Sequence, residues 1–354
     1  MNGDAKIDIR AISLADIEKF FIENNEKPFR ARQVYEWLWK KACRSFGEMT
    51  NLSRESRQLM EERFIFPVLN VEKENTSADG TIKSLFRLPD GLFVEGVLIP
   101  EGTRTTACIS SQVGCPLACT FCATGFLGFK RNLGFTEIVD QVTETNRQSL
   151  KYFHIPLSNI VFMGMGEPLL NYEEVKKSIE KITSVDGLAM SPQRITVSTV
   201  GIPSMIRQLA DDNIRFHFAL SLHAADNAKR TKIIPLNKKY PVEELIESLK
   251  YFHITTKKRV TIEYLLFNGF NDTLTDASDL ARFCRNFPVK INLIDYNPVN
   301  GSVYKKSEPA KLNAFKEFLE KRNLVVNVRK SRGADINAAC GQLAAKQGSR
   351  SDSF

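Results

Sequence analysis

Apolar and polar positions follow a helical rhythm in the first part of the chain. Apolar residues recur every three or four positions in residues 13–25, 30–42 and 53–64, and a serine that can cap a helix opens the first stretch. The three stretches predict a small helical domain. Its core is expected to hold the large side chains of the second stretch, which are Tyr35, Trp37, Leu38 and Trp39.

The rhythm changes after this region. Residues 83–100 have the alternating pattern of a β-hairpin around Pro89, Asp90 and Gly91. Beyond the hairpin, short apolar stretches rich in β-branched residues alternate with helical patterns. The strand-like stretches are residues 105–110, 159–166, 194–201, 215–223, 259–267 and 290–298. The helical patterns between them include residues 136–148, 172–182, 242–252 and 275–284.

This alternation predicts an α/β fold. Strands that alternate with helices form parallel sheets, and nearly continuous apolar strands fit a sheet that is covered on both faces. Six strand–helix units are fewer than the eight of a closed barrel. The pattern therefore favours an open, partial (βα)6 barrel, and a doubly wound sheet is the alternative. Residues 324–337 are a candidate for a further strand and loop.

This interpretation divides the chain into four segments. A helical accessory domain is expected at residues 1–80, the hairpin at 81–104, the barrel core at 105–337, and a C-terminal loop with a tail at 338–354. The polar composition of residues 346–354 predicts disorder in that tail.

Composition and charge narrow the functional class. The 354 residues are 43% hydrophobic and 25% charged, as in soluble globular proteins, and neither a signal peptide nor a membrane span is evident. These features predict a cytoplasmic protein with no membrane partner. The formal net charge of +8 favours a polyanionic partner, and residues 301–354 contribute eleven Lys or Arg against five Asp or Glu. The basic clusters at 27–32 and 40–44 fit a solvated surface equally well.

Three cysteines stand close together in "GCPLACTFCATG", residues 114–125. Cys115, Cys119 and Cys122 have the spacing C-x3-C-x2-C. Thiolates bind the iron of iron–sulfur clusters, and an ordinary four-iron cluster uses four of them. A loop with three leaves one iron free for the amino and carboxylate groups of a small molecule. A zinc site is the alternative, with its fourth ligand from another cysteine or a histidine.

Further polar residues follow predicted strands, where the ligands of parallel α/β folds bind. The segment "MGMGEP" (163–168) ends the second barrel strand, and its glycines let the backbone approach a ligand, although a tight turn explains them as well. Ser198 and Asn297 fit ordinary caps at strand ends or ligand contacts. The full set in such positions, besides this segment, is Ser198, Ser221, Leu222, His223 and Asn297.

Together these motifs resemble known enzymes. The C-x3-C-x2-C loop after the first barrel strand, with a glycine-rich segment one strand–helix unit later, resembles the radical S-adenosylmethionine (SAM) enzymes. The chain as a whole resembles the RlmN/Cfr family of radical SAM RNA methyltransferases. The stretches that carry this resemblance are residues 29–57, 108–125, 162–172, 221–223, 296–298 and 329–343.

The resemblance implies the cofactors and the residues that bind them. A [4Fe–4S] cluster would be held by Cys115, Cys119 and Cys122. In its reduced form the cluster would pass an electron to SAM, which then yields a 5′-deoxyadenosyl radical. The SAM pocket would be lined by Gly166, Glu167, Ser198, Ser221, Leu222, His223 and Asn297.

The family's route also implies roles for three more residues. The C2 or C8 carbon of adenine is electron-poor and cannot attack the methyl group of SAM. Cys340 would therefore take a methyl group from one SAM and carry it as S-methylcysteine. A radical made from a second SAM would activate that methyl group for addition to adenine. Cys108 would release the product through a transient disulfide with Cys340, and Glu95 would accept a proton.

The resemblance implies partners as well. Residues 46–53 look like the branch that methylates C2 of adenosine in 23S rRNA, at the peptidyl-transferase centre, and C2 of the adenosine 3′ to the anticodon in tRNA. Flavodoxin or ferredoxin would supply electrons to a monomeric enzyme. RNA phosphates would contact residues 129–132 and 328–333. The basic residues expected to contribute from the accessory domain are Arg30, Arg32, Lys40, Lys41 and Arg44.

Two alternatives stay open at this point. The Cfr type directs the same machinery to C8 of adenosine and confers ribosomal antibiotic resistance. A zinc-stabilised RNA-binding protein without catalysis is an alternative of another class. It leaves Cys108, Cys340 and the SAM-pocket motifs without a role.

Overall fold

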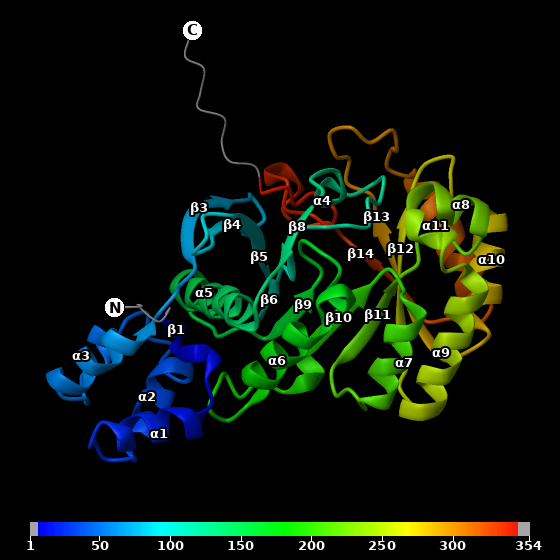
Figure 1. Ribbon diagram of the computed structural model, residues 1–354. Helices are drawn as coiled ribbons and strands as arrows, with labels where there is room; N and C mark the ends of the chain where they lie inside the picture. Colours follow the sequence, from blue (N-terminus) through cyan, green and yellow to red (C-terminus); the bar gives the residue numbers. More distant parts are fainter. Residues whose placement is uncertain (1–5, 346–354) are drawn as a thin grey trace, which may run out of the picture.

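A single ten-stranded sheet dominates the computed structural model, which describes residues 6–345 (Figure 1). One part of the sheet is parallel. Its strands are β6 (Arg104–Cys108), β9 (Asn159–Phe162), β10 (Ile195–Thr199), β11 (His217–Ser221), β12 (Val260–Leu266), β13 (Val289–Asp295) and β14 (Val326–Arg329). The other part is antiparallel and consists of β3 (Asn70–Thr76), β4 (Ile82–Arg87) and β5 (Phe93–Glu101).

The strand order confirms the open, partial barrel. Across the sheet it runs β14-β13-β12-β11-β10-β9-β6-β5-β4-β3, so each parallel strand lies beside its predecessor in the chain. A doubly wound sheet would need a reversal of this order, and none occurs. Within the part of the chain that the structure describes, β14 and β3 remain the two edges of the sheet, so the barrel is not closed.

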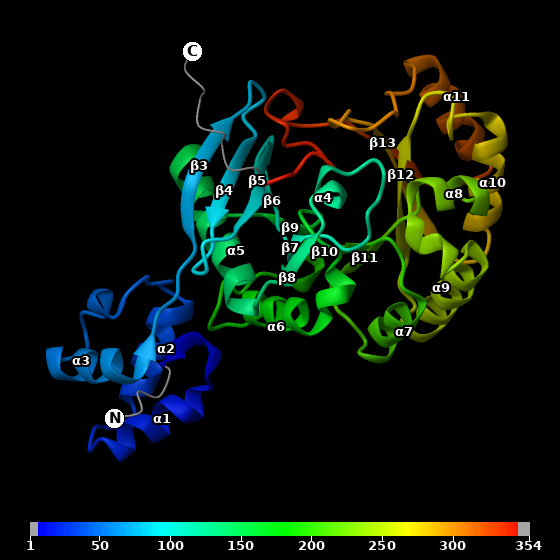
Figure 2. The ribbon, with the colours of Figure 1, turned by 45° about the horizontal axis from the view of Figure 1, so that its top comes forward.

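The connecting helices cover the outer side of the curved sheet (Figure 2). They are α5 (Phe135–Phe153), α6 (Tyr172–Thr183), α7 (Pro203–Asp211), α8 (Asn227–Ile233), α9 (Val242–Thr256), α10 (Leu274–Cys284) and α11 (Pro309–Glu320). Each longer helix buries one apolar stripe; α6, for example, buries Tyr172, Val175, Ile179 and Ile182. The main hydrophobic core therefore lies between the sheet and this outer layer.

The six predicted barrel strands are all present, and β14 confirms a further strand within residues 324–337. The predicted strands run too far at their carboxyl ends. The apolar stretch 159–166, for example, contains β9 only to Phe162. The residues beyond that point leave the sheet and turn into the site described below, where Met165 is buried and Met163, Gly164 and Gly166 are partly covered.

The N-terminal region is helical, as predicted. Its elements are β1 (Ile7–Asp8), α1 (Leu14–Glu23), α2 (Arg30–Trp39), α3 (Arg54–Arg63) and β2 (Phe64–Ile65). Ser13 and Asp16 form a reciprocal cap at the start of α1. Leu38 and Trp39 are buried, whereas Tyr35 and Trp37 are only partly covered. The region packs on α5 through ion pairs, such as the one between Arg44 and Glu144 at 3.1 Å.

The hairpin around Pro89, Asp90 and Gly91 is confirmed as β4 and β5. β3 lies inside the segment 1–80 that was expected to be helical, yet it pairs with β4 and belongs to the main sheet. Its sequence, NVEKENT, has little apolar alternation because it is an exposed edge strand. The division of the chain into four segments otherwise stays a prediction.

The tail 346–354, for which disorder was predicted, lies outside the described residues. Between residues 6 and 345, no helix combines the length and the apolar character that crossing a membrane requires.

Candidate active site

The three-cysteine loop is closed at its base by a small sheet of its own. β7 (Gln112–Gly114) pairs with β8 (Phe129–Asn132), and the short helix α4 (Ala123–Phe126) follows the third cysteine. Gly114 has φ +75°, and a Cβ atom there would lie 1.8 Å from the carbonyl oxygen of Gly128. Only glycine fits this crossing, so the loop geometry depends on it.

The loop forms one wall of a cavity at the carboxyl ends of the parallel strands. All three loop cysteines line it. The other predicted site residues on its wall are Gly166, Glu167, Ser198, Ser221 and His223. Residues from three strand ends and one loop thus meet around one space, as in the ligand sites of parallel α/β folds.

The thiols of this loop are free, and burial disfavours the ionised forms of Cys115 and Cys119. Burial raises the pKa of Cys115 to about 12 and raises the pKa of Cys119 well above its ordinary value. Such thiols become thiolates when a metal supplies the positive charge. Between residues 6 and 345, no three His, Cys, Asp or Glu side chains surround a point where a single metal ion would bind. Three free thiols along one cavity wall are donors that suit an iron–sulfur cluster.

The glycine-rich segment is held in a rigid turn. Gly166 has φ +99°, and a Cβ atom there would lie 2.6 Å from the Cβ of Gln112. The Glu167 amide donates to the Gln112 side-chain oxygen at 2.8 Å. The Glu167 carboxylate accepts from the amides of Leu169 and Val200, each at 3.0 Å. Burial raises the pKa of Glu167, and these hydrogen bonds oppose the rise. The segment therefore presents a fixed backbone to the cavity.

His223 is a neutral donor in this wall. The residue is 4% exposed, and its backbone has the left-handed conformation, with φ +57°. Its Nδ1 accepts from the amide of Leu265 at 3.1 Å, which leaves its proton on Nε2. Burial, together with the charge of Arg230, lowers the pKa of His223 to about 3. The hydroxyls of Ser198 and Ser221 lie 3.1 Å apart on the same wall and can donate or accept.

Two predicted pocket residues do not line this cavity. Leu222 is fully buried in the main core, and its carbonyl accepts from Arg230 at 3.2 Å. Asn297 donates its side-chain amide to Ser331 at 2.8 Å. Their assignment to a SAM pocket stays a prediction.

A second cavity adjoins the first and shares part of its wall. Cys108, the last residue of β6, lies on its wall together with Lys330 and Arg332. Five residues line both cavities: Met163, Ile294, Arg329, Cys340 and Leu343. Cys340 therefore stands at the boundary, with the three-cysteine loop in one space and Cys108 in the other.

Cys340 is close enough to Cys108 for its charge to affect the ionisation of that thiol. Burial raises the pKa of Cys108 to about 12, and a negative charge on Cys340 raises it further. Burial also raises the pKa of Cys340, whereas the positive charge of Arg329 lowers the pKa of both thiols. Arg329 thus favours the thiolate forms of this pair.

Glu263 and Arg329 are site residues that the sequence analysis missed in this role. Glu263, on β12, is 3% exposed, and its carboxylate accepts from Asn292 at 2.8 Å and from Arg329 at 3.3 Å. A glutamate inside the apolar stretch VTIEYLL was the available signal. Arg329 lies in the segment 328–333 for which phosphate contacts were predicted, but its guanidinium pairs inside the protein.

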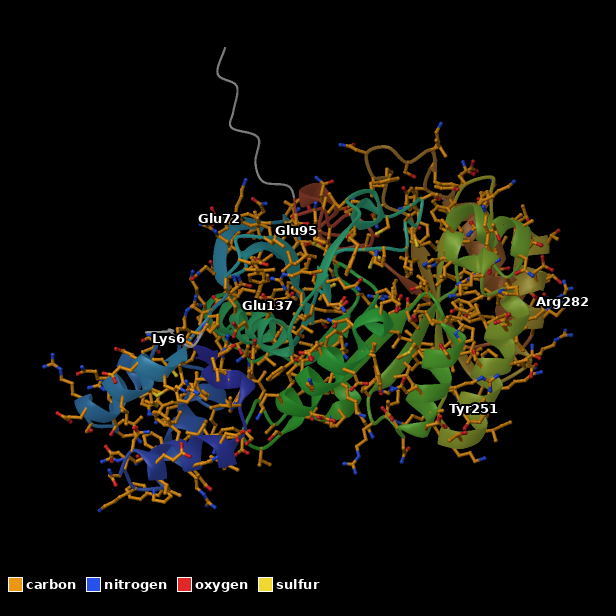
Figure 3. The ribbon with its side chains drawn as sticks, viewed as in Figure 1. Lys6, Glu72, Glu95, Glu137, Tyr251 and Arg282 are labelled. Atoms are coloured by element: carbon orange, nitrogen blue, oxygen red, sulfur yellow. The ribbon has the colours of Figure 1, made fainter. Side chains whose placement is uncertain are left out.

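Glu95 lies on β5, and its carboxylate lines neither cavity. Figure 3 shows it beside the red C-terminal segment. One carboxylate oxygen lies 3.2 Å from the ammonium of Lys83, and the other accepts from the amide of Ala344 at 2.7 Å. The residue is 6% exposed, so Glu95 is buried, and each of its carboxylate oxygens has one partner.

Several arginines expected to bind RNA have partners within the protein. Arg131 forms ion pairs with Asp90 at 2.6 Å and with Glu137 at 2.8 Å. Arg44 pairs with Glu144, and Arg30 pairs with Glu26 at 2.7 Å. These pairs brace the loop and the N-terminal region. Exposed positions in the expected set are Arg32, Lys40, Lys41, Lys130, Lys330 and Arg332.

Comparisons with known proteins agree along the whole chain. Residues 7–65 match the family model "Ribosomal RNA large subunit methyltransferase N-terminal domain", and residues 109–281 match "Radical SAM superfamily". The crystal structure of a radical SAM methyltransferase from Sphaerobacter thermophilus superposes with a TM-score of 0.91 at 38% identity, covering 96% of this chain and 100% of that one.

Sequence relatives give the same result. A probable dual-specificity RNA methyltransferase RlmN of Christiangramia forsetii is 51% identical over 343 residues, which is 97% of each chain. A dual-specificity RNA methyltransferase RlmN of an Anaeromyxobacter species is 44% identical over 345 residues, covering 96% of this chain and 91% of that one.

Proposed function

Because the chain belongs to the RlmN family of radical SAM RNA methyltransferases, we propose that it methylates C2 of adenosine in 23S rRNA and in tRNA. Members of this family use a [4Fe–4S] cluster and SAM. In 23S rRNA the target is the adenosine of the peptidyl-transferase centre, and in tRNA it is the adenosine 3′ to the anticodon. The proposal places the enzyme in the cytoplasm with flavodoxin or ferredoxin as electron donor.

The first cavity suits the cofactors of this family. Cys115, Cys119 and Cys122 would hold the cluster, which supplies the electron for SAM cleavage when it is bound. The rigid backbone of Gly166 and Glu167 can accept from the amino group of SAM. The Ser198 and Ser221 hydroxyls and the Nε2–H of His223 offer donors and acceptors for its ribose and adenine.

The position of Cys340 on the wall of both cavities is the observation that carries this proposal. In the first cavity its thiolate sulfur can attack the methyl carbon of SAM, the carbon–sulfonium bond breaks, and S-adenosylhomocysteine leaves. In the second cavity the resulting methyl group faces the space beside Cys108. A carrier that serves two substrates in turn needs such a boundary position. The charge of Arg329 supports the thiolate that this attack requires.

The second cavity is proposed to receive the target base. An adenine inside folded RNA must leave its stack to reach a buried site. Lys330 and Arg332 lie on the wall of this cavity and can contact the flanking phosphates. After transfer, the sulfur of Cys108 would attack the sulfur of Cys340. The bond from that sulfur to the new carbon substituent would then break with its electron pair on the carbon, and this carbon would take up a proton to become the methyl group. A disulfide between the two cysteines would remain, to be reduced before the next cycle. All seven cysteines are free thiols in this structure, and the disulfide is proposed as a transient species.

Mass spectrometry of nucleosides tests the proposal directly. The anaerobically reconstituted enzyme, given SAM, a low-potential reductant and unmodified 23S rRNA or tRNA, should produce 2-methyladenosine in each RNA. Formation of 8-methyladenosine would overturn the regiochemistry and support a Cfr-type enzyme. Product from rRNA alone would remove tRNA from the proposal.

A further inference from the structure

The C-terminal segment that carries Cys340 is fastened to the rest of the protein on both sides of that residue. Before it, the Asp335 carboxylate accepts from the Ser77 hydroxyl at 2.6 Å, and the Lys83 ammonium donates to the carbonyl of Asn337 at 3.3 Å. After it, the Thr124 hydroxyl donates to the carbonyl of Leu343 at 2.7 Å. The segment is therefore a strap that crosses from the β3–β4 turn to the three-cysteine loop.

Glu95 supplies the last of these fastenings. Its carboxylate accepts from the Ala344 amide at 2.7 Å and pairs with Lys83 at 3.2 Å. Lys83 lies on β4 opposite Val97, so it is the diagonal neighbour of Glu95 on one face of the hairpin. The side chains of Lys83 and Glu95 are only 12% and 8% exposed, which strengthens the interaction relative to a surface pair.

We propose that Lys83 is a positioning residue for the reaction: it fixes the Glu95 carboxylate and the Cys340 strap against each other as one latch. This inference rests on the proposed function and on the role of proton acceptor that the family resemblance implies for Glu95. Lys83 contacts both parts, the carboxylate directly and the strap through the Asn337 carbonyl. It touches neither cavity, so it acts through Glu95.

The latch has a consequence for the order of events. Each Glu95 oxygen has one donor while the strap is in place, and each keeps a lone pair that can accept a proton. Protonation of Glu95 removes its negative charge and weakens its bonds to Lys83 and Ala344. Proton uptake by Glu95 therefore loosens the strap that carries Cys340.

The test uses the full-length, cluster-loaded enzyme in hydrogen–deuterium exchange. Lys83→Met keeps the length of the side chain and removes the charge. It should raise the exchange rate of peptides covering 338–345 about tenfold, and Lys83→Arg should restore protection. Lys73→Met, at an exposed position of β3 in the same sheet, is the matched control and should leave exchange unchanged. Unchanged exchange in Lys83→Met would overturn the latch.

A kinetic split separates positioning from a general loss of structure. Lys83→Met should keep methylation of Cys340 by SAM within about threefold, measured as a mass increase of the intact protein. It should slow formation of methylated adenosine at least tenfold, because Glu95 is no longer fixed. Equal slowing of both steps would contradict a positioning role.

Glu95→Gln distinguishes a failure of the latch from a failure of the proposed function. The latch predicts faster exchange over 338–345 in this variant, whatever happens to activity. Faster exchange with full RNA methylation would remove Glu95 as the base and leave the latch standing. Lost methylation with unchanged exchange would keep the base and overturn the latch. Because this variant keeps the side-chain shape, it also serves if Lys83→Met does not fold.

Discussion

Cys108 and Cys340 share one cavity wall although they come from opposite ends of the barrel. Cys108 ends β6, the first parallel strand, and Cys340 follows β14, the last. No local sequence pattern links the two residues. They lie together because of where the fold places the C-terminal strap. A negative charge on Cys340 raises the pKa of Cys108, so the two thiols are close enough to act in sequence on one bound group.

Removing either cysteine should stop the reaction at a different point. Cys340→Ala should form no methylated adenosine and no adduct, because the methyl carrier is absent. Cys108→Ala should form a covalent protein–RNA adduct that it cannot resolve, with product reduced by at least about a thousandfold. Denaturing electrophoresis followed by mass spectrometry of nuclease-trimmed protein would detect the adduct. Cys284→Ala, which removes a buried thiol on α10, is the control and should retain activity.

Iron content should depend on the three-cysteine loop alone. Cys115→Ala, Cys119→Ala and Cys122→Ala should each yield colourless protein with little iron after anaerobic reconstitution, because three thiols are the fewest that hold such a cluster here. The unchanged protein should be brown and contain about four iron atoms per chain. Cys43→Ala should stay brown, since Cys43 lies in the core of the N-terminal region. Stoichiometric zinc in the unchanged protein would instead support the non-catalytic alternative.

His223 should make the fold sensitive to mild acid. The pKa of His223 is lowered to about 3 in the folded state, against about 6.5 in an unfolded chain. The folded protein therefore takes up this proton only at a lower pH than the unfolded chain does. The stabilisation is complete above pH 6.5 and is lost as pH falls toward 3. Between pH 7.5 and 5.5 the loss should be on the order of 1 kcal/mol.

The matched variant for this prediction is His223→Asn. Asparagine tolerates the left-handed conformation and can accept from the Leu265 amide, but it does not titrate. The melting temperature of the variant should fall less than that of the unchanged protein between pH 7.5 and 5.5. Identical slopes would show that His223 is not the group responsible.

Arg329 should set the pH at which Cys340 reacts. Its charge opposes the rise in pKa that burial imposes on Cys340. In Arg329→Met the thiolate is harder to form, so the pH profile of Cys340 methylation by SAM should move to higher pH. Arg329→Lys retains the charge and should move it less. A lowered rate with an unmoved profile would indicate a role in packing only.

What the sequence could predict depends on how local each signal is. The buried parallel strands were predictable because their apolar runs are nearly continuous, and the cysteine loop because three ligands stand in one short stretch. β3 was missed because an exposed edge strand has few apolar positions to mark it. The predicted strands extend beyond the observed ones because the turn that follows a strand continues its apolar composition.

The contacts made by distant residues could not be predicted in the same way. Glu95 was identified by resemblance, but its bonds to Lys83 and Ala344 depend on where the C-terminal strap lies. Likewise Glu263 was only an acidic residue in an apolar strand until Arg329, two strands away on β14, proved to be its partner. Such pairs are set by packing, which a periodic pattern does not encode.

Gly166→Ala should weaken SAM binding through a clash that the structure defines. The added Cβ would lie 2.6 Å from the Gln112 Cβ and 2.8 Å from its backbone nitrogen, which cannot move aside because β7 holds it. The positive φ adds strain of roughly 1–2 kcal/mol. SAM affinity, measured by equilibrium dialysis on the cluster-loaded enzyme, should fall at least about tenfold.

Gly91→Ala separates the effect of the clash from the effect of backbone strain, since Gly91 has φ +82° with nothing within 4 Å of the added carbon. That control should lower the melting temperature slightly and leave SAM binding intact. Equal affinity in both variants would mean that the turn at Gly166 does not shape the pocket.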